Sequence, residues 1–180
     1  MRNVVMIMTA SVDGFISTPD GMPAGAMSEP PELKRWKLDR ISGAGAHLMG
    51  RKTYEGMSDY WPTSKDAYAA PMNNIPKVVF SKTLKKAEWP TSTIANGKLE
   101  DEINALKRGR GGELIVWGGA GFVQSLSRAN LIDEYAIITS PLAYGGGKPM
   151  FLDLPNALEF KLLAASVYGN HLLRIYRRKD

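Results

Sequence analysis

Short apolar runs recur along the chain, and the stretch 4–9 is the clearest of them. Val, Met and Ile follow one another there without polar alternation, which predicts a strand buried on both faces. Turn residues follow this run at Asp13-Gly14. Further runs with the length and composition of strands lie at 46–49, 77–80, 113–117 and 133–139.

Apolar residues at helical spacing lie between these runs. Leu33, Trp36 and Ile41 predict a first helix, which Ser28 is expected to cap and which is expected to end at the glycines of 43–45. More helices are predicted at 52–57, 99–106 and 122–129.

The C-terminal part of the chain has a different pattern. Two strand-like stretches, 159–167 and 171–176, flank Gly169-Asn170, a strong signal for a tight hairpin. With the earlier elements this gives about eight strands and four helices in alternation. We therefore expect one α/β domain over residues 1–180, with three α-β-α layers and a mostly parallel sheet that ends in an antiparallel hairpin.

The amino-acid composition limits the kinds of reactive or metal-binding site that the chain can contain. The 180 residues include no cysteine, which excludes disulfides, thiolate catalysis and cysteine-ligated zinc. Only His47 and His171 are present, so we expect no histidine-based metal site. The first ten residues lack the pattern of a signal peptide, and no run approaches the ~20 apolar residues that span a membrane. We expect a protein of a reducing compartment, the cytoplasm.

The charge balance is modestly basic. Lysine and arginine number 23 against 18 acidic residues, a formal net charge of +5. The basic residues are scattered in small groups, and the aromatic signature of an RNA-binding sheet is missing, so a nucleic-acid partner is disfavoured. An anionic small molecule suits this balance better.

Two glycine turns stand where a strand meets a helix. Residues 118–121 read Gly-Gly-Ala-Gly, whose backbone N–H groups can face a phosphate or a nicotinamide. The other interpretation is a tight turn without a ligand, because the spacing matches neither the dinucleotide nor the P-loop fingerprint. Gly50, Arg51, Lys52 and Thr53 open the other helix with two cations and a hydroxyl, which suits a phosphate group or, more simply, a solvated helix start.

The remaining candidate binding or catalytic residues give weaker evidence for a site when each is considered alone. Lys82, beside Ser81 at a strand end, suits a further phosphate but is also an ordinary surface lysine. Asp13 is first a turn residue, and Glu32 is a single acid in the first helix. The four tryptophans fit the core or the wall of a cleft better than base stacking.

Together these segments resemble the dihydrofolate reductase superfamily, and more closely the reductase domain of the riboflavin-biosynthesis deaminase-reductase in its small stand-alone form. The resemblance covers residues 4–177 and rests on five segments in order, at 10–16, 48–55, 78–82, 116–121 and 137–147. It implies the dihydrofolate reductase-like fold.

The resemblance also implies NADPH as the cofactor. The pyrophosphate is expected at Gly50, Arg51, Lys52 and Thr53, and the adenosine 2′-phosphate at Ser81 and Lys82. The nicotinamide half is expected against the residues Ala10, Gly118, Gly119, Ala120, Gly121 and Phe122. The residues themselves agree, since no acid is obviously placed for the free ribose 2′-hydroxyl of NADH.

The catalytic group is less well defined by the resemblance. Dihydrofolate reductases bind the pterin with a carboxylate on the first helix, and Glu32 is the candidate here. A small shift of register places Lys34 there instead. Thr139 matches the threonine that supports that carboxylate, and Asp13 is the other candidate acid.

The best single expectation for the reaction is NADPH-dependent reduction of 5-amino-6-(5-phosphoribosylamino)uracil. Reduction of dihydrofolate or another pteridine is one alternative, and NADPH binding without turnover is another. The chain has no cysteine for the zinc deaminase that accompanies the bifunctional enzyme. By resemblance we also expect a homodimer, with a small-molecule substrate and neither a nucleic-acid nor a membrane partner.

Overall fold

A computed structural model describes residues 1–24 and 29–179 and shows the expected α/β architecture. Its main sheet has eight strands in the order β5-β4-β3-β6-β1-β7-β10-β9. The strands are β1 (Val4–Ala10), β3 (Ala46–Gly50), β4 (Lys77–Phe80), β5 (Ser92–Ala95), β6 (Leu114–Val116), β7 (Glu134–Thr139), β9 (Phe160–Tyr168) and β10 (His171–Arg178). A two-stranded sheet pairs β2 (Phe15–Ser17) with β8 (Lys148–Pro149).

The main sheet is parallel from β5 to β7 and antiparallel from there onward. β1 lies between β6 and β7 and pairs with both in parallel. β10 runs antiparallel to β7, and β9 runs antiparallel to β10. The prediction of a parallel sheet with a C-terminal hairpin is thus confirmed.

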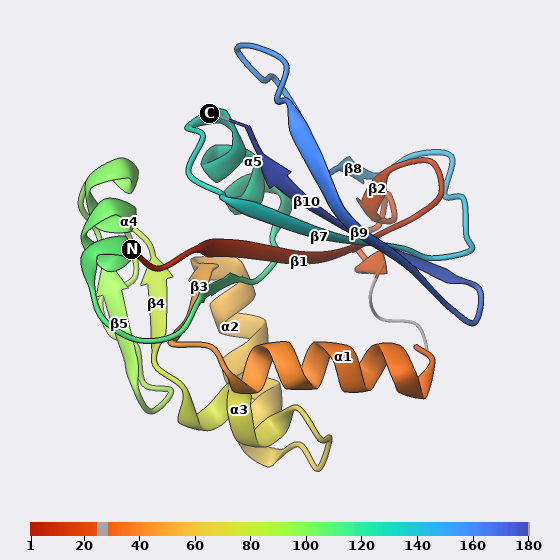
Figure 1. Cartoon of the computed structure of the whole chain (residues 1–180). Coiled ribbons are helices and arrows are strands. Elements are labelled where there is room, and N and C mark those ends of the chain that lie inside the picture. The colour runs from red at the N-terminus through yellow and green to blue at the C-terminus, as the bar shows by residue number, and fades with distance from the viewer. Residues whose placement is uncertain (25–28, 180) are drawn as a thin grey trace.

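Helices cover both faces of the sheet (Figure 1). One face carries α1 (Pro31–Ser42), α2 (Arg51–Tyr60) and α3 (Ala69–Asn74), and the other carries α4 (Leu99–Arg108) and α5 (Ala120–Arg128). A short 3₁₀ helix, Trp61–Thr63, extends α2. Val4, Val5 and Met6 of β1 are fully buried because alternate side chains enter the two cores. This accounts for the absence of polar alternation in that run.

Several elements differ from the sequence prediction. α2 continues through residue 60 rather than 57, and β2, β5, β8 and α3 were not predicted. α1 begins at Pro31, with Pro30 at the capping position. The predicted cap Ser28 lies outside the described residues.

A buried lysine closes the end of α3. Lys77 is fully buried, and its Nζ donates to the carbonyl oxygens of Met72, Asn73 and Ile75 at distances of 2.7–3.0 Å. These carbonyls lie at the C-terminal end of the helix, where a cation is favoured. Burial lowers the pKa of Lys77 to about 8.

Candidate active site

The carboxyl ends of parallel strands β1 and β6 open into a cleft of about 500 Å³. Such an edge is the usual position of a ligand site in an open α/β sheet. Its wall brings together segments that are far apart in the sequence: the end of β1, the start of α2, and the glycine turn between β6 and α5. The residues contributed by these segments are Ile7, Met8, Thr9, Lys52, Thr53, Gly56, Met57, Trp117, Gly118, Gly119 and Ala120.

The two predicted glycine turns are locked to each other. Thr53 donates its hydroxyl hydrogen bond to the carbonyl oxygen of Gly118. Gly119 has a φ of 101°, and an added Cβ there would lie 2.6 Å from Oγ1 of Thr53. The turn therefore requires glycine for its conformation and for its close approach to α2.

Two helices start at this edge without a side chain that caps them. α2 begins at Arg51 directly after β3, and α5 begins at Ala120, and neither has a capping hydrogen bond from a side chain. Their first N–H groups are the kind of donors that bind phosphate at a helix N-terminus. Lys52 adds a cation to the cleft, whereas Arg51 pairs with Glu55 at 2.8 Å on the surface of α2.

A second cavity of about 380 Å³ lies on the other side of the first turn of α5. Ala120 lines the cleft, and Phe122, two residues later, lines this second cavity. Ser81, Lys82 and Lys98 also line it, as does one acid, Glu100. Of the predicted phosphate residues, Lys52 and Thr53 thus line the cleft and Ser81 and Lys82 line this second cavity, whereas Gly50 and Arg51 line neither.

The polar part of the cleft is cationic. Lys37, Lys52 and Lys148 line it, and no acid is among the described residues of its wall. Trp117 forms part of the apolar wall, and its Nε1 donates to Nδ1 of His47 at 3.0 Å. Burial, the largest effect, lowers the pKa of His47 to about 4, so its imidazole is neutral and accepts this bond near neutral pH.

The predicted catalytic residues do not converge on the cleft. The Asp13 carboxylate accepts hydrogen bonds from the hydroxyl of Ser11 and from the backbone N–H groups of Tyr144 and Gly145. These bonds, led by the one from Ser11, hold the pKa of Asp13 below its usual value. Asp13 therefore links the loop after β1 to the loop that contains Tyr144 and Gly145.

The structure does not bring Glu32 and Thr139 together. Glu32 is exposed on α1. Thr139 accepts a hydrogen bond of 2.7 Å from Nη2 of Arg174, on the sheet face opposite to α1. Lys34, the alternative in the other register, pairs with Asp66 at 2.8 Å.

Ala10 also takes a backbone role, because its carbonyl oxygen accepts from the backbone N–H and the hydroxyl of Ser140. Gly50 stands at the N-terminal end of α2, and an added Cβ would lie 3.3 Å from Cβ of Phe122. Gly121, in the first turn of α5, has open space where a side chain would begin.

Sequence reasoning missed two charged residues beside the cleft, Glu29 and Lys37. Lys37 lies one turn after Leu33 and one turn before Ile41, both fully buried. A lysine in this apolar stripe was the available signal, because it must be buried with a partner. The partner, Glu29, comes before the helix and gives no periodic signal.

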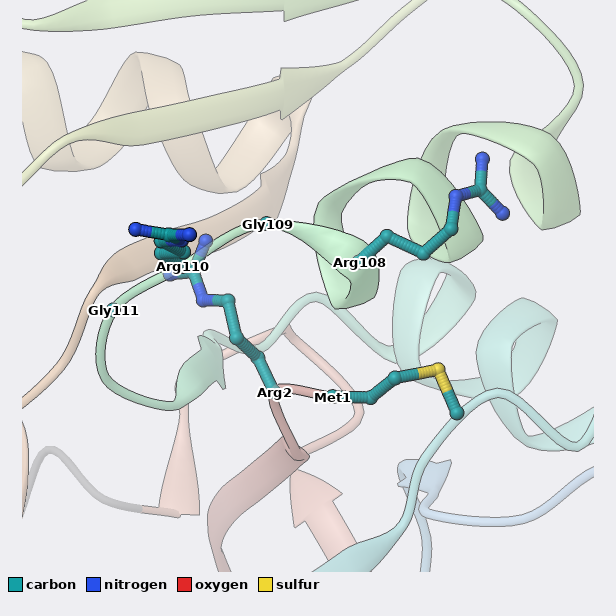
Figure 2. Close-up of a pocket in the computed structure, with 6 residues that line it drawn as sticks. All are labelled: Met1, Arg2, Arg108, Gly109, Arg110 and Gly111. Atoms are coloured by element: carbon teal, nitrogen blue, oxygen red, sulfur yellow. The ribbon is translucent and has the colours of Figure 1, made fainter.

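A third cavity lies at the opposite, amino-terminal edge of the sheet. Figure 2 shows its lining by Met1, Arg2 and the turn that carries Arg108 and Arg110. Its volume is about 620 Å³. In Figure 2 the side chain of Arg108 points away from that of Arg2.

Within residues 1–24 and 29–179, no three histidine or acidic side chains come together as metal ligands. The helices of this described part include none with the length and apolar character needed to cross a bilayer.

Solved structures share this fold over the whole chain. A "putative riboflavin biosynthesis protein" of Shewanella sp. PV-4 is 26% identical, covers 100% of both chains and has a TM-score of 0.82. Dihydrofolate reductase of Enterococcus faecalis, solved with NADP(H), is 18% identical over 99% of this chain and 97% of its own, with a TM-score of 0.66. The dihydrofolate reductase-like fold is thus confirmed.

A two-function enzyme contains the same fold as one of its parts. The deaminase and 5-amino-6-(5-phosphoribosylamino)uracil reductase of Thermotoga maritima has a TM-score of 0.73 at 15% identity. The match covers 99% of this chain and 57% of that one. Among curated relatives, YyaP of Bacillus subtilis is 24% identical over 97% of this chain and 93% of its own. Residues 2–173 match the RibD C-terminal domain, and the chain therefore belongs to that family.

Proposed function

We propose that the chain is an NADPH-dependent reductase whose substrate is an anionic pyrimidine or pteridine. The observation that supports this proposal most strongly is the pair of cavities on the two sides of the first turn of α5. A dinucleotide has two halves joined by a pyrophosphate, and two cavities joined by an uncapped helix start match that shape.

The residues present fit such a cofactor. The first N–H groups of α2 and α5 and the ammonium of Lys52 would hold the pyrophosphate. The backbone of Gly118 and Gly119 lines the cleft where the nicotinamide half would lie. Gly56, which lines the cleft, has open space at the position of a Cβ, so the wall leaves room for a ligand there.

The second cavity supports NADPH over NADH. Lys82 and Lys98 outnumber the single acid Glu100 among its lining residues, and Ser81 adds a hydroxyl. The backbone N–H groups of Thr83 and Leu84 already donate to Oγ of Ser81, which leaves its own proton available for a phosphate oxygen. A 2′-phosphate gains charge-assisted hydrogen bonds there.

The cleft favours a flat, anionic substrate. Trp117, Met57 and Ile16 give it apolar walls, while Lys37, Lys52 and Lys148 give it positive charge. When bound, the reduced nicotinamide supplies the hydride, and the protein has to align the acceptor carbon and exclude water. Within this class, 5-amino-6-(5-phosphoribosylamino)uracil is our first candidate, because its heterocycle and phosphate match the two parts of the cleft.

A parallel titration with NADPH and NADH at fixed salt tests the cofactor. We expect micromolar binding that favours NADPH, followed by turnover of the pyrimidine substrate and not of dihydrofolate. Equal affinity for both cofactors would contradict the 2′-phosphate site. Binding without turnover of either substrate would leave a nucleotide-binding protein, and no binding by folded protein would end the reductase proposal.

We also propose a homodimer formed through β9. This strand is at one end of the main sheet, so one row of its backbone groups is open to another strand. Leu162, Leu163 and Val167 are exposed on it by 53%, 40% and 74%. Sedimentation of the wild type and of a Leu163→Lys variant tests this, and a monomeric wild type would contradict it.

A further inference from the structure

A partly buried ion pair lies beside the cleft, next to the start of α1. The Glu29 carboxylate accepts two short hydrogen bonds, one from the hydroxyl of Tyr68 and one from Nζ of Lys37, both at 2.6 Å. The side chains of Glu29 and Lys37 are 19% and 16% exposed. A partly buried pair that is also held by a third group keeps its geometry better than an exposed ion pair.

Lys37 connects this pair to the cleft. Together with Thr9 it lines both the cleft and a small cavity formed by Ala24, Glu29, Leu33, Ile138 and His171. Of these two shared residues only Lys37 has an ionisable side chain. Of the three cleft lysines, it is the one that the described residues pair with a carboxylate.

The hydrogen bonds around Glu29 fix the position of the Lys37 ammonium group. One of its three protons goes to Glu29, which leaves two for an acceptor in the cleft. Tyr68 occupies the other carboxylate oxygen, so Glu29 cannot turn away without breaking a second hydrogen bond. The hydroxyl of Tyr68 keeps its proton, since burial is the largest of the effects that raise its pKa.

We propose that Lys37 is the proton donor of the reduction, and that Glu29 and Tyr68 are positioning residues that hold it. This inference rests on the proposed reductase function. It places the proton donor on Lys37. The other two candidates are less suitable, because Asp13 binds the backbone N–H of Gly145 and Glu32 is exposed.

The step balances as follows. The substrate carbon of a C=N or C=O group accepts the hydride and forms a C–H bond, and the π electron pair moves to the nitrogen or oxygen. That atom takes a proton from Nζ of Lys37, which becomes a neutral amine and regains a proton from water. The two electrons come from the nicotinamide cofactor, which is oxidised while the substrate is reduced.

The experiment compares Lys37→Met with Arg35→Met. Arg35 lies on the same helix, is exposed and does not line the cleft. We expect Lys37→Met to bind NADPH within about threefold of the wild type while kcat for the pyrimidine substrate falls by about 10²–10⁴. Arg35→Met is expected to keep both values.

The Glu29→Gln variant separates a proton donor from a merely structural lysine. Without the carboxylate the ammonium is less stabilised, so the alkaline limb of the kcat profile should move to lower pH. The titratable and charged groups that face Lys37 are Glu29, Tyr68, His171, Lys52 and Lys148. Because His171 is among them, a His171→Gln variant controls for its imidazole. ¹⁵N NMR of Nζ follows the same titration without turnover.

The outcomes are distinct. A wild type that does not bind NADPH, or binds it and reduces nothing, overturns the proposed function and this inference with it. A wild type that turns over together with a Lys37→Met variant within threefold of it overturns only the proton donor. An alkaline limb and a Nζ titration unchanged by Glu29→Gln would show that Glu29 does not position Lys37.

Discussion

The two edges of the sheet use the same residue types for different purposes. At the amino edge, Arg2 lies among glycines that have no spare room, because a Cβ on Gly45 or Gly112 would collide with its guanidinium or with neighbouring backbone. At the carboxyl edge, Gly56 and Gly121 face open space. Glycine thus permits close packing at the amino edge, and at the carboxyl edge Gly119 does the same beside Gly56 and Gly121, which leave space open.

The basic residues follow the same division. At the amino edge the guanidinium of Arg2 donates to the carbonyl oxygen of Gly112 at 2.7 Å, and Arg40 bridges Glu113 and Glu134. At the carboxyl edge Lys52 and Lys148 line the cleft, with no acid among the described residues of its wall. The cavity at the amino edge (Figure 2) lies at the C-terminal end of α4, whereas the cleft lies at the N-terminal ends of α2 and α5, which makes the cleft the better candidate for an anionic ligand.

The largest expected effect is at the amino edge, from Gly112→Ala. Its Cβ would meet the carbonyl oxygen of Gly43, and backbone cannot move aside as a flexible side chain can. We expect a loss of about 3 kcal/mol or more in the free energy of unfolding, measured by chemical denaturation. Gly121→Ala at the carboxyl edge is the matched control and should leave stability within about 0.5 kcal/mol. Equal losses in the two variants would remove the distinction between the edges.

The pH dependence of stability tests the link between the cleft and the core. Buried His47 has a pKa of about 4 against 6.5 unfolded, so the unfolded chain takes up its proton first as the pH falls. Its contribution is complete above pH 6.5 and declines towards pH 4, by about 3 kcal/mol at most.

Denaturation of the wild type and of His47→Gln at several values between pH 7.5 and 4.5 measures this contribution. The variant should lose stability at neutral pH, and its stability should depend less on pH. The fluorescence of Trp117 in the folded wild type should change only as the pH approaches 4, because protonation of Nδ1 of His47 then removes its acceptor. Parallel pH profiles of the two proteins would contradict this account.

The sequence predicted the parts of this molecule whose burial is complete. Val4, Val5 and Met6 form an unmistakable strand because both faces of β1 are covered. β5 was missed because it is short and partly exposed, and α3 was missed because its six residues include Pro71. The glycine turns carried enough local information to predict where the cleft lies.

The missed residues of the site depend on tertiary contacts. Lys37 lies on the buried stripe of α1, and its partner Glu29 is eight residues earlier in the chain and outside the helix. The hydroxyl of Tyr68, 39 residues after Glu29, completes the group. Neither pair lies within one helix or strand, so the periodic pattern of the sequence does not reveal these contacts. The side of the sheet on which Thr139 lies is equally hard to predict, since one residue along a strand exchanges the two faces of the sheet.

Removal of the two neighbouring cations at the start of α2 is expected to have a smaller effect, a weaker binding of the cofactor. The double variant Arg51→Ala/Lys52→Ala should weaken NADPH binding by about 2 kcal/mol, or roughly thirtyfold, because a charge-assisted contact is worth about 1.5–3 kcal/mol and Arg51 already pairs with Glu55. Arg108→Ala/Arg110→Ala removes the same charge from the amino edge and should leave the affinity unchanged. Calorimetric titration at two salt concentrations measures both. Equal weakening would indicate that overall charge, and not the start of α2, attracts the cofactor.

A small gain in stability is expected from the most direct test of why Gly56 is a glycine. Gly56 lies inside α2, where alanine is favoured over glycine by about 0.5–1 kcal/mol, and its Cβ would project into the unobstructed cleft. We expect Gly56→Ala to raise the free energy of unfolding by about that amount while it weakens the binding of NADPH or substrate. Denaturation and titration of the same preparation measure the two effects. If the variant is more stable and binds as well as the wild type, Gly56 does not reserve space for a ligand. If it is less stable, α2 packs more tightly there than the structure shows.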